Sequence, residues 1–182
     1  MTMLSMSGSF LNKQSVAALC QGLVHSNVEV LDLSHAELSR TSMAAVLRVL
    51  PRTNIRSLNL RANSFGARGT AALFDARIRE LDASNNDVDD DVYKCLALAL
   101  PKLLVRKVDL YDNPLTDAAA LVLPDCLSKS SRLVQLLVER NDLSKDAEDA
   151  LIQAAQEHRV RLWTEFDDVD EEDDDEVIPK GQ

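Results

Sequence analysis

Three aspartates at alternate positions, Asp87, Asp89 and Asp91, form the part of the chain most similar to a metal-binding motif. Helix-flanked calcium loops begin with carboxylates at this spacing, but they also need Gly at the sixth position and Glu at the twelfth. Val92 and Leu98 hold those two positions here. The aspartates are better explained as a solvated helix start whose negative charge suits the helix dipole. We expect no metal site there.

The histidines and cysteines do not indicate a stronger site. No histidine has a second His or Cys at ligand spacing, apart from Cys20, which lies five residues before His25. An odd number of widely separated cysteines favours neither a disulfide framework nor a zinc site. We expect the cysteines to be small core residues of helices. The residues considered are His25, His35, His158, Cys20, Cys95 and Cys126.

Familiar catalytic patterns are also missing from the sequence. The chain has no glycine-rich phosphate loop, no nucleophile elbow and no HExxH pair. We therefore expect a protein that is not an enzyme, with no catalytic residues and no cofactor.

Acidic residues concentrate near the end of the chain. The 182 residues include 20 Lys and Arg and 30 Asp and Glu, for a net charge of −10. Ten of the twelve residues 165–176 are acidic, so the remainder carries 20 acids and 20 bases. A neutral remainder argues against direct nucleic-acid binding. The acidic residues are Glu165, Asp167, Asp168, Asp170, Glu171, Glu172, Asp173, Asp174, Asp175 and Glu176.

We expect residues 165–182 to form a disordered acidic tail. Such a tail either keeps the protein soluble or attracts a basic partner, and the sequence leaves both interpretations open. No apolar run approaches the roughly 20 residues that span a bilayer, so we expect no membrane insertion. The first 13 residues do not have the pattern of a signal or transit peptide. We expect a cytoplasmic location, with a nuclear or a cytoskeletal or flagellar assembly as alternatives.

A repeated pattern explains most of the chain. Segments that begin near residues 28, 55, 78, 105 and 133 share one order of apolar positions, and their central residues are 27, 23, 27 and 28 positions apart. Each unit alternates apolar and variable residues over a short stretch and then changes to helical spacing. Ser39, Asp89, Thr116 and Ser144 are suitable N-caps for the helices, and Pro51 and Pro101 mark two helix ends.

These units define the expected domain. One strand and one helix per unit cannot bury their apolar side alone, but stacked units share a continuous core. We expect residues 1–164 to form the domain, with 1–27 as an N-terminal cap or degenerate repeat and 159–164 as a C-terminal cap that includes Trp163. The second unit is short and contains Gly66 and Gly69, so its helix should be shorter than the others.

The pattern Ile55-x-x-Leu58-x-Leu60-x-x-Asn63-x-Phe65 resembles the leucine-rich repeat. The repeat length of 27 to 28 residues and the helical stretch in each unit resemble the ribonuclease-inhibitor-like subclass of this family. The resemblance implies an α/β solenoid, shaped as a right-handed horseshoe segment, with a parallel sheet on the concave face and helices on the convex face. It also implies that one column of asparagines binds loop backbone between turns, starting one repeat late because Ala36 holds the first position. That column is Asn63, Asn86, Asn113 and Asn141.

In this template, variable residues of the strands point to the concave face. They form a mostly acidic row flanked by basic and aromatic residues, which either binds a protein partner or is a solvated face whose charges pair among themselves. The partner-binding candidates are Asp32, Asn59, Arg61, Asp82, Lys107, Asp109, Tyr111, Glu139 and Arg140.

Three functions remain open. The first is a protein–protein interaction module or scaffold subunit, monomeric on its own, that binds another protein with a basic surface or within a larger assembly. The second, suggested by a weaker similarity to Ran GTPase-activating proteins, is a regulator of a GTPase. The third is an acidic-tail chaperone for histones or other basic proteins.

Overall fold

The computed structural model describes residues 1–66 and 70–164 as an α/β fold built on a seven-stranded, all-parallel sheet. The strands follow one another in sequence order across the sheet. They are β1 (Met3–Ser5), β2 (Val30–Asp32), β3 (Ser57–Asn59), β4 (Glu80–Asp82), β5 (Lys107–Asp109), β6 (Gln135–Leu137) and β7 (Arg161–Trp163).

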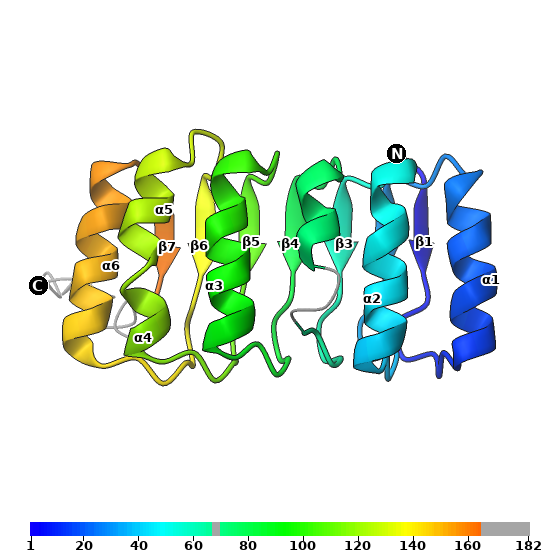
Figure 1. The fold of residues 1–182 in the computed structure, drawn as a ribbon, viewed down its shortest axis with the longest axis horizontal. Coiled ribbons are helices and arrows are strands. Elements are labelled where there is room, and N and C mark those ends of the chain that lie inside the picture. Colours follow the sequence, from blue (N-terminus) through cyan, green and yellow to red (C-terminus); the bar gives the residue numbers. More distant parts are fainter. Residues whose placement is uncertain (67–69, 165–182) are drawn as a thin grey trace, which may run out of the picture.

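Helical segments connect the strands and lie together on one side of the sheet (Figure 1). The α-helices are α1 (Lys13–Val24), α2 (Arg40–Val49), α3 (Asp90–Ala99), α4 (Asp117–Ala120), α5 (Leu123–Lys129) and α6 (Lys145–Glu157). Three 3₁₀ helices span Leu50–Arg52, Thr70–Asp75 and Leu100–Lys102. The molecule is elongated, with β1 and β7 at opposite ends of the row of strands (Figure 1).

The strand register follows the spacing of the sequence repeats. Leu31 pairs with Leu58, which pairs with Leu81, and the series continues through Val108 and Leu136. The central residue of each of these five strands is buried. The flanking residues of β2 to β6 are half-buried or exposed because successive side chains of a strand point to opposite faces.

Residues 1–27 also form a strand–helix unit. Leu4 pairs with Leu31 across β1 and β2, at the 27-residue offset of the later repeats. Asn12 begins α1, and its side-chain oxygen accepts hydrogen bonds from the backbone N–H groups of Gln14 and Ser15. The unit therefore extends the sheet by one strand at its amino-terminal end.

The expected N-caps form in three longer helices. The hydroxyl oxygens of Ser39 and Ser144 accept bonds from Ser42 and Ala147, and a carboxylate oxygen of Asp89 accepts one from Val92. Among its described residues, the second unit has the six-residue 3₁₀ helix Thr70–Asp75 as its helical segment, which agrees with the shorter helix expected from its length.

Pro51 and Pro101 lie just past the ends of α2 and α3, inside short 3₁₀ helices. Pro124 lies near the start of α5, where the helical stretch after Leu115 is divided into α4 and α5. Proline lacks an N–H group and its ring collides with the carbonyl four residues earlier, so a continuous helix is disfavoured there.

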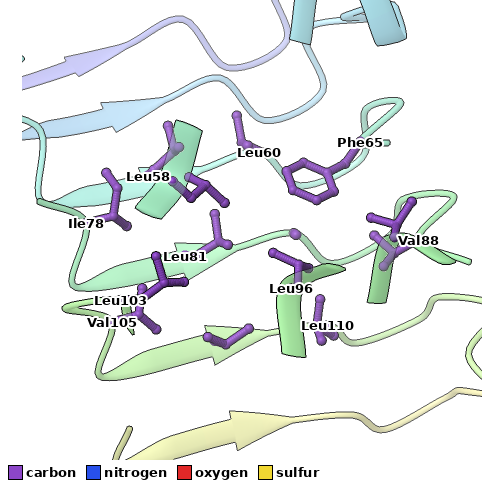
Figure 2. Packing of buried hydrophobic residues seen from close by; sticks show 14 of the residues in the cluster. Leu58, Leu60, Phe65, Ile78, Leu81, Val88, Leu96, Leu103, Val105 and Leu110 are labelled. Atoms are coloured by element: carbon purple, nitrogen blue, oxygen red, sulfur yellow. The ribbon is translucent and has the colours of Figure 1, made fainter. Parts of the chain in front are cut away.

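One aliphatic core runs along the molecule between the strands and the helices. Figure 2 shows the part of it under β3, β4 and β5, with the ring of Phe65 in the loop that follows β3. Phe65 occupies the position that Leu38, Val88 and Leu115 hold in other units, and all four are buried.

The expectation that Cys95 is a core residue is wrong, whereas Cys20 and Cys126 are buried as expected. Val92, Tyr93, Leu96 and Ala97 are buried side chains of α3, and Leu100, which directly follows the helix, is buried beside them. These residues define one helix face, and at about 100° per residue Cys95 lies well outside it. Tyr93 takes an interior position that the apolar pattern did not reveal.

The four asparagines at the repeated position connect neighbouring loops. Asn113 Oδ1 accepts bonds from the N–H groups of Asn86 and Val88, and its Nδ2 donates to the carbonyl oxygens of Ala83 and Leu110, among others. Asn63, Asn86 and Asn141 form equivalent bonds with Leu38, Phe65 and Leu115. In the unit that begins near residue 28, Ala36 holds this position, and its backbone carbonyl oxygen accepts the hydrogen bond from the Leu11 N–H.

Candidate functional site: the open face of the sheet

The side of the sheet opposite the helices carries two columns of outward side chains. We define the open face by these columns and by Arg61, Tyr111, Glu139 and Arg140, which lie two or three positions after the end of a strand. One column pairs Val30, Ser57, Glu80, Lys107 and Gln135 in register. The other pairs Asp32, Asn59, Asp82, Asp109, Leu137 and Trp163. The register thus places the expected polar row side by side on adjacent strands.

Each polar side chain of the second column also forms a hydrogen bond with the backbone just after the end of its strand. One side-chain oxygen of Asp32, Asn59, Asp82 or Asp109 accepts a hydrogen bond from the backbone N–H two residues later, at 2.9–3.0 Å. This is the Asx-turn, a local bond typical of Asp and Asn. The row therefore has a structural role that charge alone did not reveal. Leu137 ends the series because its side chain has no acceptor.

The ionisation of the row differs from strand to strand. Burial raises the pKa of Asp109, and the neighbouring Asp82 charge adds to this rise; the Tyr111 N–H, Lys107 and Arg61 oppose it. Burial also acts to raise the pKa of Asp32, but hydrogen bonds from Ser34 and Ser5 outweigh it, and the pKa of Asp32 is lowered. Asp109, the last acid of the row, is thus a residue whose charged form the fold disfavours, whereas the fold favours the charged form of Asp32.

A hollow on the open face includes Asp109. It is lined by side chains from β3, β4 and β5, including the carboxylates of Glu80, Asp82 and Asp109 and the ammonium group of Lys107. Ser57 Oγ donates to Glu80 Oε2 at 3.2 Å. Mixed charges lining a shallow hollow suit a polar contact with another macromolecule better than an apolar small molecule.

Aromatic side chains lie toward the carboxyl-terminal end of the same face. The Arg140 guanidinium lies 5.6 Å from the centre of the half-buried Tyr111 ring, within the range of a cation–π contact. Trp163 is 43% exposed and pairs with Leu137. Tyr, Trp and Arg are the residue types most enriched where protein interfaces gain their affinity.

Trp163 does not cover the end of the core, contrary to the expectation from its terminal position. The central residue of β7 is Leu162, which pairs with Leu136 on the core side, so Trp163 belongs to the open face. Val160 and Thr164, on either side of β7, are the buried residues there. The sequence missed Trp163 as a candidate site residue because its strand lacks a complete repeat.

The remaining candidate residues lie around this face. Arg61 and Arg140 are exposed, whereas Glu139 is half-buried and follows β6. Arg140 has a positive φ of 53°, as do His35, Ala62, Asn85 and Asp112 at values of 50–56° in the equivalent position. This left-handed residue turns the chain away from each strand, and only its recurrence in the structure identifies it. The acidic tail, Asp167 to Glu176, lies outside the described residues.

No group of three His, Cys, Asp or Glu side chains that could hold a metal ion occurs within residues 1–66 and 70–164. Cys20 and His25 line one hollow together with Arg52. Burial raises the pKa of the Cys20 thiol, which disfavours the thiolate needed for metal binding. Within the part of the chain that the structure describes, no helix is long and apolar enough to cross a membrane.

Comparison with known proteins gives a similarity of fold. No protein-family model matches the chain, and no curated protein matches it significantly. A solved structure described as Leiomodin-1 Actin-Binding Site 2 (ABS2) is similar with a TM-score of 0.53 and 12% sequence identity. The match covers 86% of this chain and 81% of that one, so the likeness of fold extends over most of both chains.

Proposed function

We propose that this chain is a leucine-rich repeat protein of the ribonuclease-inhibitor-like subclass. The registered strands, the helical segment in each unit and the asparagine bonds between loops support this assignment. In this proposal the units form a curved solenoid whose open face is concave, because helices take more room than strands.

The proposed function is non-enzymatic binding of another protein through the open face. The observation that carries this proposal is that charged and aromatic side chains share one face. The charged residues lie on β3 to β5, and Tyr111, Arg140 and Trp163 lie beside them on the same face. The charged residues can select a partner of complementary charge. The aromatic residues can strengthen the complex when the partner buries them.

The acidic residues of this chain indicate which kind of surface its partner should have. The acidic row on the open face and the acidic stretch 165–176 both favour a partner with a basic surface. The described structural neighbour is an actin-binding site, which makes actin the first named partner to test and keeps a cytoplasmic, cytoskeletal location as part of the proposal.

The test compares proteins captured from the native cell by three forms of the full chain. The open-face variant D82N/D109N/Y111S keeps both Asx-turn acceptors while removing two charges and one aromatic ring. The control variant D91N/D149N/K94S changes exposed or half-exposed residues of α3 and α6. Purified actin is tested separately by cosedimentation.

We expect quantitative mass spectrometry to show partners that the wild type and the control retain equally and that the open-face variant loses at least tenfold. An unchanged partner set for the open-face variant would contradict binding through this face. Cosedimentation that is equal for wild type and variant would exclude actin as the partner of this face.

A further inference from the structure

A row of arginines lies at the edge of the sheet where the strands begin. Arg56, Arg79 and Arg106 hold the same position, one residue before β3, β4 and β5. The Arg79 N–H donates to the Arg56 carbonyl oxygen at 2.6 Å, and the Arg106 N–H to the Arg79 carbonyl oxygen at 2.7 Å. The three backbones are therefore adjacent, at the strand spacing of about 4.8 Å.

Two of these arginines line a groove with a third. Arg79, Arg106 and Arg132 are exposed and surround a hollow that also contains Leu104 and Ser131. Leu104 is 38% exposed and supplies an apolar surface beside the guanidinium groups. We call these five residues the arginine groove.

The fold does not require arginine at these positions. The same backbone bonds form where the residue is Glu29 or Val134: the Arg56 N–H donates to the Glu29 carbonyl, and the Val134 N–H to that of Arg106. Adjacent like charges cost stability. Among residues 1–66 and 70–164, no carboxylate lies within 4.0 Å of the guanidinium nitrogens of Arg79, Arg106 or Arg132, so no described carboxylate neutralises the groove at that range.

Guanidinium groups bind carboxylates through paired hydrogen bonds, so the groove suits an acidic peptide. The chain carries such a segment, residues 165–176, which begins two positions after the end of β7. Only β6 separates β7 from β5 (Figure 1), so the groove lies roughly 10 Å across the sheet from β7. The groove is at the strand-start edge, so the chain leaving the end of β7 must also run back along the length of one three-residue strand, about 10 Å. Twelve residues can extend to about 40 Å.

We propose that the acidic segment 165–176 docks in the arginine groove of its own chain. Attachment to β7 gives the segment an effective concentration in the millimolar range, which favours it over a free acidic peptide. Docking masks the acidic charge from a basic partner until that partner competes for it. This inference concerns the strand-start edge and does not depend on binding at the open face.

The experiment uses the full chain in two tail forms, wild type and a variant with all ten acids of residues 165–176 changed to their amides. The probe is a fluorescein-labelled peptide with the sequence of residues 165–176, followed by fluorescence anisotropy in 50 mM salt. We call the chain with amides in the tail the amide-tail form, and we combine it with further substitutions. These are either the groove substitutions R79Q/R106Q/R132Q or the charge-matched control K13Q/R48Q/K94Q, whose residues lie on α1, α2 and α3.

We expect the peptide to bind the amide-tail form at least tenfold more tightly than the wild type, whose groove is already occupied. The groove variant should lose at least tenfold of this affinity, the control should keep it, and 0.5 M salt should abolish it. Equal binding to wild type and amide-tail form would overturn the proposal, as would equal losses in the groove and control variants. A wild-type dimer that becomes a monomer in the amide-tail form would overturn the same-chain assignment in favour of a second copy.

Discussion

Asp32 and Asp109 hold equivalent positions on β2 and β5, yet their pKa values move in opposite directions. Both accept a backbone hydrogen bond two residues later. Asp32 gains further bonds from the hydroxyls of Ser34 and Ser5, whereas Asp109 is more deeply placed and faces the charge of Asp82. Asn59 shows that an amide fits the same turn.

Replacing each aspartate by asparagine should therefore change stability with opposite signs. The folded state holds the Asp109 proton more tightly than the unfolded chain, so this residue lowers stability as pH rises from 3.8 through its raised folded pKa. D109N should be more stable than wild type at pH 7, with a difference that vanishes below pH 3.8.

Asp32 contributes stability above its ordinary pKa of 3.8 that is lost as pH falls through the lowered folded value. D32N should consequently be less stable than wild type at pH 7, with the difference narrowing in acid. Urea unfolding followed by circular dichroism at pH 3, 5 and 7 measures both variants. Shifts of the same sign at pH 7 would contradict the two environments described above.

Tyr93 is a buried residue whose hydroxyl has no hydrogen-bond partner among the described residues. Burial raises the pKa of this phenol well above its usual value. Y93F keeps the ring and removes the unpaired hydroxyl, so we expect it to stabilise the protein by about 1 kcal/mol.

Thermal unfolding measures this change, with Y111F as the control. Tyr111 is half-buried, and its variant should differ from wild type by less than about 0.5 kcal/mol. A loss of stability in Y93F would mean that the hydroxyl has a partner beyond the described residues.

At the scale of elements, periodicity predicted what repeats. The apolar spacing located the strand centres of β2 to β6, and the short second unit indicated its reduced helix. Departures within a unit were harder to predict. The apolar pattern placed Cys95 in the core, but a side chain's face depends on the rotation of α3, which Tyr93 and Ala97 set by packing inward.

The asparagine bonds are a property of neighbouring elements rather than of one residue. Asn113 is 5% exposed, and loss of its amide would leave backbone groups of two units without partners. N113A should lower the free energy of unfolding by more than about 2 kcal/mol. N54A removes an exposed side chain with one bond to the Ser26 carbonyl oxygen and should cost less than about 1 kcal/mol.

Denaturant unfolding of the two variants provides the measurement. Similar small losses for N113A and N54A would show that the loops hold together without the buried amide.

At the scale of the molecule, the sequence indicated which residues share the open face because the repeat length sets the strand register. It did not indicate the Asx-turns, since spacing alone does not show which oxygen accepts a bond. Nor did it reveal the place of Trp163, whose strand has no complete repeat around it. The row formed by Arg56, Arg79 and Arg106 emerged only when the backbone bonds placed them side by side.

Trp163 gives the most direct measurement of partner binding because it is the single tryptophan of the chain and lies on the open face. We would label the full chain with 5-fluorotryptophan and record its one ¹⁹F resonance while adding the partner that the capture comparison identifies. The account predicts a shift or broadening of this resonance that saturates with binding and is absent for the D82N/D109N/Y111S variant. A resonance that stays unchanged while the partner binds fully would contradict binding through the open face.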